Sequence, residues 1–130
     1  MIRVNDKKVG LDAVFKNGDT MLHKTHRHEP PVTATSIEIV EETDDGILVI
    51  NKPASIPVHP SGRFAYNSIV SILKHVHGYK KLHPANRLDR LTSGLMVLGL
   101  TTEKARELEE AMRTRKVQKE YIARVVGEFP

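Results

Sequence analysis

The segment Asn86–Gly94 places one acidic side chain between two arginines. Asp89 follows Arg87 by two residues and directly precedes Arg90. Neighbouring positive charge favours the ionised form of a carboxyl group, and an ionised carboxylate can act as a nucleophile. The two guanidinium groups can hold a polyanionic substrate over it. The spacing therefore predicts a nucleophile, although an aspartate in a loop more usually only forms a turn.

The composition of the 130 residues restricts the function classes. A chain of this length holds one domain, with room for a small appendage. The absence of cysteine excludes disulfides, thiolate catalysis and cysteine-ligated metals. A net charge of +4 and a pI near 9.4 predict a polyanionic partner such as a nucleic acid. The composition does not indicate an oligomeric state.

The sequence shows neither a membrane span nor a secretory signal. Its apolar runs are too short to cross a bilayer, and the N-terminus lacks a long apolar stretch. We therefore expect a soluble intracellular protein without a membrane partner. The sequence does not distinguish between the cytoplasm, the nucleus and the mitochondrion.

The chain divides near residue 33 into a short N-terminal segment and a larger domain. Residues 1–33 combine strand-like runs with turn signals and end in a linker that contains two adjacent prolines. In residues 34–130, the apolar periodicity predicts strands at 37–41, 47–50, 95–100 and 117–125, a helix over 69–76, and a second helix that Thr102 caps. The step Asp45-Gly46 suits a tight hairpin between the first two strands. The expected fold class is α+β, with a mixed, largely antiparallel sheet and packed helices after a small β-rich segment.

The C-terminal part carries a basic segment, residues 104–124, with seven lysines and arginines. Release of counterions from phosphates drives binding to such a segment, so it is a candidate for a nucleic-acid-contacting face. Glutamates are interleaved with these bases, and the alternative is a solvated helix face with paired charges. Taken alone, the segment favours this alternative.

Three motifs occur together in an order and spacing typical of one enzyme family. They are Asn-Lys-Pro-Ala-Ser-Ile-Pro-Val-His-Pro at 51–60, Arg-Leu-Asp through Thr-Ser-Gly at 87–94, and Lys-Glu-Tyr at 119–121. With them, residues 37–130 resemble the N-terminal half of the catalytic domain of RluA-type RNA pseudouridine synthases. Two positions depart from the usual motifs: Ser55 stands where glycine is more usual, and Asn86 where histidine is common. Lys52, in the first motif, is expected to shape the loop beside the site.

The resemblance implies an isomerase that converts uridine to pseudouridine in structured RNA. The N1–C1′ glycosidic bond breaks, the uracil rotates, and C5 bonds to C1′, so no cofactor and no metal are required. The target nucleotide must leave its helix, which costs free energy for unstacking and unpairing. We expect tRNA as the substrate, with rRNA and mRNA as alternatives.

The resemblance also implies roles for individual side chains. Asp89 is the nucleophile that attacks the sugar or the base, and Tyr121 stacks on the uracil near the C5 proton. Arg87 fills the gap left by the flipped nucleotide or contacts phosphate. Lys119 contacts phosphate or supports the aspartate. The expected RNA contacts are Arg87, Arg90, Lys119 and Lys52.

Residues 2–32 resemble the tail of a small RNA-binding module of the ribosomal-protein type, through Val4–Val9 and Gly18-Asp19. The leading helices of that module have no counterpart before Met1. The family's catalytic domain continues for roughly another hundred residues, in line with common domain sizes, and supplies a basic residue that pairs with the catalytic aspartate. We therefore expect the chain to be a fragment or a truncated product that lacks part of its sheet and site.

Two other functions stay open at this point. A truncated, catalytically inactive RNA-binding protein would keep the basic surface. A metal-dependent hydrolase would use His23, His26 and His28, whose spacing suggests metal ligation. Histidines in a polar linker without supporting carboxylates are more often solvated, so we expect no metal there.

Overall fold

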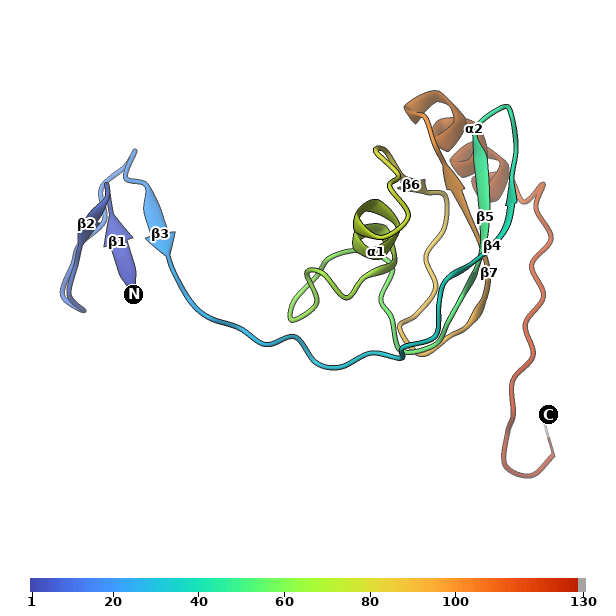
Figure 1. The fold of residues 1–130 in the computed structure, drawn as a ribbon, viewed down its shortest axis with the longest axis horizontal. Helices are drawn as coiled ribbons and strands as arrows, with labels where there is room; N and C mark the ends of the chain where they lie inside the picture. Colours follow the sequence, from blue (N-terminus) through green and yellow to red (C-terminus); the bar gives the residue numbers. More distant parts are fainter. Residues whose placement is uncertain (129–130) are drawn as a thin grey trace.

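The computed structural model describes residues 1–128, which form two sheets and two helices (Figure 1). The strands are β1 (Ile2–Val4), β2 (Lys7–Lys8), β3 (Met21–His23), β4 (Glu38–Glu42), β5 (Ile47–Lys52), β6 (His83–Pro84) and β7 (Gly94–Gly99). The helices are α1 (Ile69–His75) and α2 (Thr102–Arg113). The strand orders are β2-β1-β3 and β4-β5-β7-β6. The α+β class with a largely antiparallel sheet is confirmed, and all strand pairs within residues 1–128 are antiparallel.

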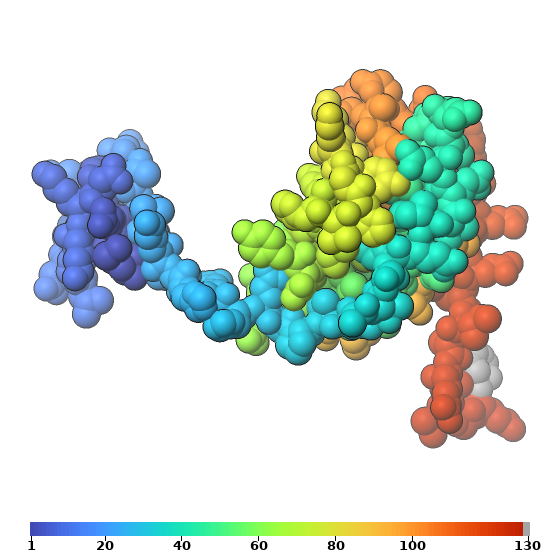
Figure 2. Space-filling view, viewed as in Figure 1, coloured from blue at the N-terminus to red at the C-terminus, as the bar shows by residue number. Residues whose placement is uncertain are grey.

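The N-terminal sheet is a small unit joined to the larger one by an extended segment. Asn5 and Asp6 have φ angles of 47° and 64° and form the two-residue turn between β1 and β2. Residues 24–37 contain no helix or strand and lead from β3 to β4 (Figures 1 and 2). The predicted boundary near residue 33 lies within this segment.

Strands β4 and β5 form the predicted hairpin. Gly46 has a φ of +92°, a left-handed conformation that glycine adopts without steric cost. Its N–H donates to the carbonyl oxygen of Thr43 at 3.0 Å, which closes the turn. The turn sets the register in which Glu42 pairs with Leu48, and this register decides which β5 side chains face the core.

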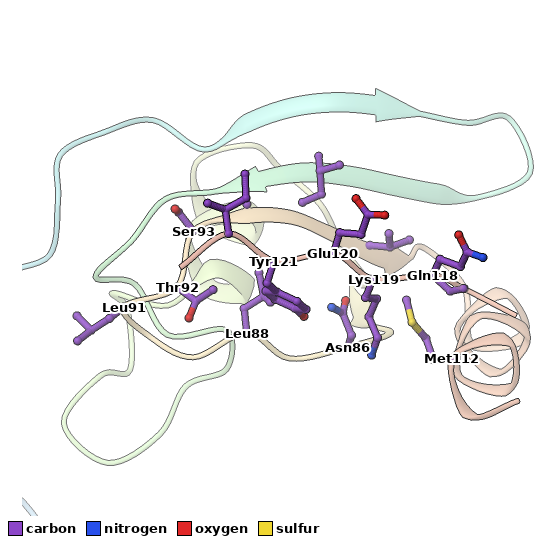
Figure 3. Close-up of a pocket in the computed structure, with 15 residues that line it drawn as sticks. Asn86, Leu88, Leu91, Thr92, Ser93, Met112, Gln118, Lys119, Glu120 and Tyr121 are labelled. Carbon is purple, nitrogen blue, oxygen red and sulfur yellow. The ribbon is translucent and has the colours of Figure 1, made fainter. Parts of the chain in front are cut away.

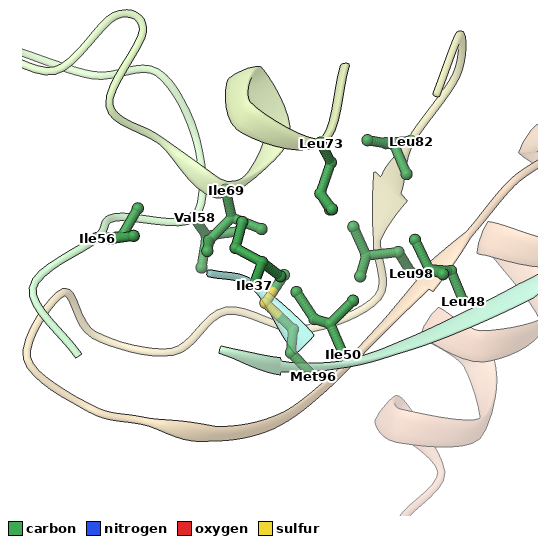
Figure 4. Close-up of a cluster of buried hydrophobic side chains, with 10 residues drawn as sticks. All are labelled: Ile37, Leu48, Ile50, Ile56, Val58, Ile69, Leu73, Leu82, Met96 and Leu98. Carbon is green, nitrogen blue, oxygen red and sulfur yellow. The ribbon is translucent and has the colours of Figure 1, made fainter. Parts of the chain in front are cut away.

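The core lies on one face of the larger sheet (Figure 4). Alternate residues of β5 and β7 point to this face, where the ladder sets Leu48 opposite Leu98. Helix α1 and the loop after β5 supply the opposing side chains. The core residues are Ile37, Leu48, Ile50, Ile56, Val58, Ile69, Leu73, Leu82, Met96 and Leu98. Burying each of these larger apolar side chains stabilises the fold by about 1.5–3 kcal/mol.

Both helices begin at a capping hydroxyl group. The Ser68 side chain accepts a hydrogen bond from the N–H of Ser71 at the start of α1. The Thr101 side chain accepts one from the N–H of Lys104 at the start of α2, so the cap lies one residue before the predicted Thr102. Among the described residues, neither helix has the length and apolar character needed to cross a bilayer.

Strand β7 and helix α2 meet in a very close contact at Gly99. A Cβ atom added to Gly99 would lie 2.6 Å from the backbone nitrogen of Ala105, closer than side chains tolerate. Only glycine therefore fits this position without displacement. The contact fixes the start of α2 against the end of the sheet, and with it the segment that follows α2.

Residues 117–125 do not form the predicted strand. They run in an extended conformation and pair with no strand in the described part of the chain. Tyr121 is 63% exposed and Ile122 fully so. The alternating pattern indicates a segment able to pair, but a strand forms only where a neighbouring strand supplies the hydrogen bonds.

Candidate active site

The loop between β6 and β7 presents Asp89 to solvent. The carbonyl oxygen of Asp89 accepts a hydrogen bond from the N–H of Thr92 at 3.1 Å, which closes a turn over residues 89–92. Gly94 then leads into β7 with a φ of +123°, which favours glycine. Because the Asp89 side chain is exposed, its carboxylate is accessible to an approaching ligand.

Lys52 lies beneath this turn with its side chain fully buried. Strand alternation places it on the core face of β5. Its ammonium group donates to the carbonyl oxygens of Pro53 at 2.9 Å, Arg90 at 3.3 Å and Thr92 at 2.7 Å. All three donors of the ammonium group thus have an acceptor, and two of these acceptors belong to the turn that carries the candidate nucleophile.

Lys52 is therefore a loop-positioning residue. Burial lowers the pKa of its ammonium group below the ordinary 10.5, since low dielectric disfavours the charged form. The residue is 0% exposed, so a phosphate cannot reach it, and the predicted RNA contact from Lys52 is wrong for this structure. The signal that would have shown this is the alternation Leu48, Ile50, Lys52, which puts the lysine on the same face as two core residues.

Ser55, in the first motif, has a left-handed backbone conformation. Its φ of +75° lies in the region that favours glycine, which accounts for glycine being usual at this position. The Ser55 hydroxyl accepts a hydrogen bond from the N–H of Thr33 at 2.8 Å. The departure from the motif thus keeps the turn and ties the linker to it.

A cavity of about 780 Å³ lies beside the Asp89 loop (Figure 3). Tyr121 and Lys119 line it from the segment after α2, and Leu88 and Thr92 line it from the loop. Aromatic and aliphatic walls with a few polar groups are typical of sites that hold a small ligand. The structure therefore brings two of the predicted site residues next to the loop that carries Asp89.

The three charged residues of the Asp89 motif lie outside this cavity. Asp89, Arg87 and Arg90 are exposed and are not among its lining residues. The ion pairs formed within residues 1–128 include none of the three. The Arg90 guanidinium instead lies over the Phe64 ring, 5.7 Å from its centre. Both arginines therefore have no carboxylate partner here and can contact phosphate.

The basic residues of helix α2 are paired with acids instead. Lys104 lies 3.0 Å from Asp45 and 2.7 Å from Glu107, and Arg113 lies 2.7 Å from Glu110. Exposed pairs of this kind contribute about 0–1 kcal/mol each, so they matter more for local charge than for stability. For this part of the basic segment, the structure supports the solvated face with paired charges.

Two of the linker histidines contact each other. The Nε2 atoms of His26 and His28 lie 2.9 Å apart, and their rings meet edge to face. His23 lies apart from the linker, in β3. In the chain up to residue 128, no three histidine or acidic side chains are grouped to hold a metal ion. This geometry gives the hydrolase alternative no support.

Comparison with known proteins identifies the class to which this chain belongs. The family model described as RNA pseudouridylate synthase matches residues 46–130, which include all of the first motif and all of the Asp89 loop. The chain therefore belongs to the RNA pseudouridylate synthase family, as its motifs predict.

Individual relatives agree with this family. A protein of Saccharomyces cerevisiae named "tRNA pseudouridine(32) synthase, mitochondrial" is 49% identical over 129 residues, covering 99% of this chain and 28% of the relative. The Homo sapiens "Pseudouridylate synthase RPUSD2" is 46% identical over 130 residues, covering 99% of this chain and 24% of the relative. A solved structure named "Human RNA Pseudouridylate Synthase Domain Containing 4" is 33% identical, with a TM-score of 0.46, over 61% of this chain and 30% of its own. The chain thus spans about a quarter of the length of the two curated relatives.

Proposed function

We propose that this chain supplies the nucleophile-bearing part of an enzyme that isomerises uridine to pseudouridine in tRNA. Membership of the family supports the reaction. The observation that carries the proposal is the exposed Asp89, held on a turn whose carbonyl groups are bound by the buried Lys52. The relative from Saccharomyces cerevisiae is named as a tRNA enzyme, which favours tRNA over rRNA and mRNA.

In the proposed reaction, Asp89 attacks the sugar or the base of a flipped uridine. The N1–C1′ bond breaks, the uracil rotates within the site, and C5 forms the new bond to C1′. The bond to Asp89 breaks again, and N1 gains a proton as the C5 proton leaves. Substrate and product are isomers, so the reaction needs no oxidant, reductant or second substrate. The Asp89 carboxylate must be ionised and reachable, and its exposure in the turn meets the second condition.

Other residues bind the flipped nucleotide and its phosphates. The Tyr121 ring stacks on the uracil, with Leu88 forming an apolar wall of the same cavity. Stacking of a base on an aromatic side chain contributes about 1–3 kcal/mol, which offsets part of the cost of flipping the nucleotide. Arg87 fills the gap that the nucleotide leaves, or binds its phosphate, and Lys119 binds phosphate at the cavity edge.

The test compares wild type and Asp89→Asn in the full-length gene product that contains these residues. Each protein is incubated with a tRNA transcript, and the pseudouridine in the digested RNA is measured by nucleoside chromatography. We expect product from the wild type and none from Asp89→Asn, with unchanged thermal unfolding because the side chain is exposed. Turnover retained by the folded variant would refute the assignment of Asp89 as nucleophile.

A second candidate function is RNA binding without catalysis. The observation that favours it is the separation of Asp89 from the cavity that Tyr121 and Lys119 line. In that case the wild type binds tRNA with strong dependence on salt but forms no pseudouridine. The same assay therefore decides between the two functions.

A further inference from the structure

Exposed basic side chains on the Asp89 loop, on the loop before α1 and on the linker form one group. It consists of Arg90, Arg63, His28 and Arg27, and we call it the linker-side basic surface. Arg27, His28 and Arg63 together line a surface hollow of about 320 Å³, although they come from distant parts of the sequence. Phe64 connects this hollow to the loop, because the Arg90 guanidinium lies over its ring.

The arginines of this surface form no ion pair within the described residues. Within residues 1–128, the ion pairs involve only Lys104 and Arg113 among the basic residues, and both of these lie on helix α2. Positive charge without a carboxylate partner attracts polyanions more strongly than paired charge does. The arginines of the linker-side basic surface are therefore available to phosphate, whereas Lys104 and Arg113 of α2 are paired with acids.

Glu29 fixes the linker in the position that forms the hollow. Its carboxylate accepts hydrogen bonds from the backbone N–H groups of Ala65 at 2.9 Å, Tyr66 at 2.7 Å and Asn67 at 2.8 Å. The Asn67 side chain also donates to the carbonyl oxygen of Pro30 at 3.2 Å. These bonds hold Arg27 and His28, which directly precede Glu29, beside Arg63.

The same hydrogen bonds stabilise the ionised form of the Glu29 carboxyl group. The hydrogen bond from Tyr66, with smaller effects from Asn67 and Ala65, lowers the pKa of the Glu29 carboxyl below the ordinary 4.5, although burial acts in the opposite direction. Glu29 is therefore ionised at neutral pH. Its two oxygens bind N–H groups, and it forms no ion pair with the arginines beside it.

We propose that the linker-side basic surface binds the backbone phosphates of the RNA strand that continues from the nucleotide at Asp89. The identification of the partner as RNA rests on the proposed function. Guanidinium groups bind phosphate with a planar pair of donors, and such contacts position an RNA without reading its sequence. The Tyr66 ring, which is 72% exposed next to the Glu29 contact, offers a face on which an unpaired base can stack.

The first test measures the affinity of the full chain for a tRNA transcript at several salt concentrations. We expect Arg27→Ala and Arg63→Ala each to lower the slope of log affinity against log salt by about 1, because each removes one phosphate contact. Arg113→Ala is the matched control, since Arg113 is exposed and paired with Glu110, and its slope should equal that of the wild type. Unchanged slopes for both surface variants, or an equal loss in the control, would overturn the proposal.

Glu29→Ala tests whether Glu29 positions Arg27 and His28 or acts on RNA binding only through its negative charge. Removing a negative charge strengthens polyanion binding by electrostatics alone, and Glu109→Ala on the exposed face of α2 should show this small increase. If Glu29 positions Arg27 and His28, however, Glu29→Ala weakens RNA binding roughly 3- to 10-fold, as expected for the loss of one to two phosphate contacts. Binding that is stronger in Glu29→Ala than in the wild type contradicts the anchoring.

Failure of this proposal and failure of the proposed function give different results. Pseudouridine formed by the wild type, together with unaltered binding in Arg27→Ala and Arg63→Ala, refutes the surface alone. Loss of binding in these variants without any pseudouridine from the wild type refutes the function alone. Competition by poly-glutamate as effective as competition by RNA would show that the surface binds acidic polypeptide, which also refutes the proposal.

Discussion

The ammonium nitrogen of Lys52 lies 2.7 Å from the carbonyl oxygen of Thr92, which is the last residue of the turn that begins at Asp89. The contact joins two of the family's motifs, because Lys52 is the last residue of β5 and Thr92 lies two residues before the start of β7. A buried cation is stabilising only where its donors are fully bound. The Asp89 turn therefore depends on the Lys52 ammonium group for its position, and the buried lysine depends on the carbonyl groups of the turn for its acceptors.

Replacing Lys52 by methionine should loosen the Asp89 turn. The side chain keeps much of its volume, but the carbonyl groups of Pro53, Arg90 and Thr92 lose their donor. We expect the free energy of unfolding to fall by about 1–3 kcal/mol, the cost of leaving buried acceptors unpaired. Urea unfolding measures this change, and amide hydrogen exchange at Thr92 should become faster.

Lys74→Met is the control for this change, because Lys74 is exposed on α1. Its effect on unfolding should stay within about 0.5 kcal/mol, as for ordinary surface positions. Equal effects of the two substitutions would show that the turn does not depend on the Lys52 ammonium group.

The sequence predicts those parts of the fold that depend on short-range patterns. The Asp45-Gly46 hairpin is confirmed because its left-handed glycine is a local requirement. The burial of Lys52 was missed because its charge, taken alone, suggested the surface, whereas its position in the strand decides its environment. Residues 117–125 were wrongly predicted as a strand, since pairing depends on a neighbour that a local pattern does not specify.

The candidate site was predictable to a similar extent. The turn at Asp89 lies within a short motif, and Tyr121 of a second motif lines the cavity beside that loop. The roles of both residues stay predictions. The contact of Glu29 with Ala65–Asn67 joins residues more than thirty positions apart in the chain. No periodicity or motif marks such a contact, because it depends on how the linker meets a folded loop.

Substitution of Gly99 should separate strand β7 from helix α2. In Gly99→Ala, the new methyl group would lie 2.6 Å from the backbone nitrogen of Ala105, so the strand or the helix must shift. We expect a loss of about 1–3 kcal/mol in the free energy of unfolding, typical of overpacking. Gly10→Ala is the control, since a Cβ at Gly10 meets nothing within 4 Å. A loss at Gly99 no larger than that at Gly10 would contradict the close contact.

Ionisation of Tyr79 should lower the free energy of unfolding at alkaline pH. Burial, and after it the hydrogen bond from the Tyr79 hydroxyl to Glu42, raises the pKa of this phenol from 10.0 to about 12. The folded state thus holds the phenol proton more tightly than the unfolded state does. The resulting stabilisation is fully present below pH 10 and is lost as the pH rises through about 12.

The ultraviolet absorbance of the phenolate measures this pKa, and urea unfolding at several alkaline pH values measures its effect on stability. In Glu42→Gln, the negative charge beside the phenol is removed, so the pKa of Tyr79 should move down toward 10.0. In Tyr79→Phe, the corresponding part of the pH dependence should disappear. A phenol that titrates at its ordinary value in the wild type would show that the contact with Glu42 is not formed in solution.

Tyr121→Phe should separate stacking from proton handling in the proposed reaction. The phenyl ring retains the aromatic face toward the cavity, so tRNA affinity should stay close to that of the wild type. The hydroxyl is lost, and if it assists departure of the C5 proton, the single-turnover rate of pseudouridine formation should fall by about 10²- to 10⁴-fold. Because the Tyr121 side chain is 63% exposed, the substitution should leave thermal unfolding unchanged, so a slower reaction reports on chemistry and not on folding. A rate equal to that of the wild type would restrict Tyr121 to stacking and would place the acceptor of the C5 proton elsewhere in the site.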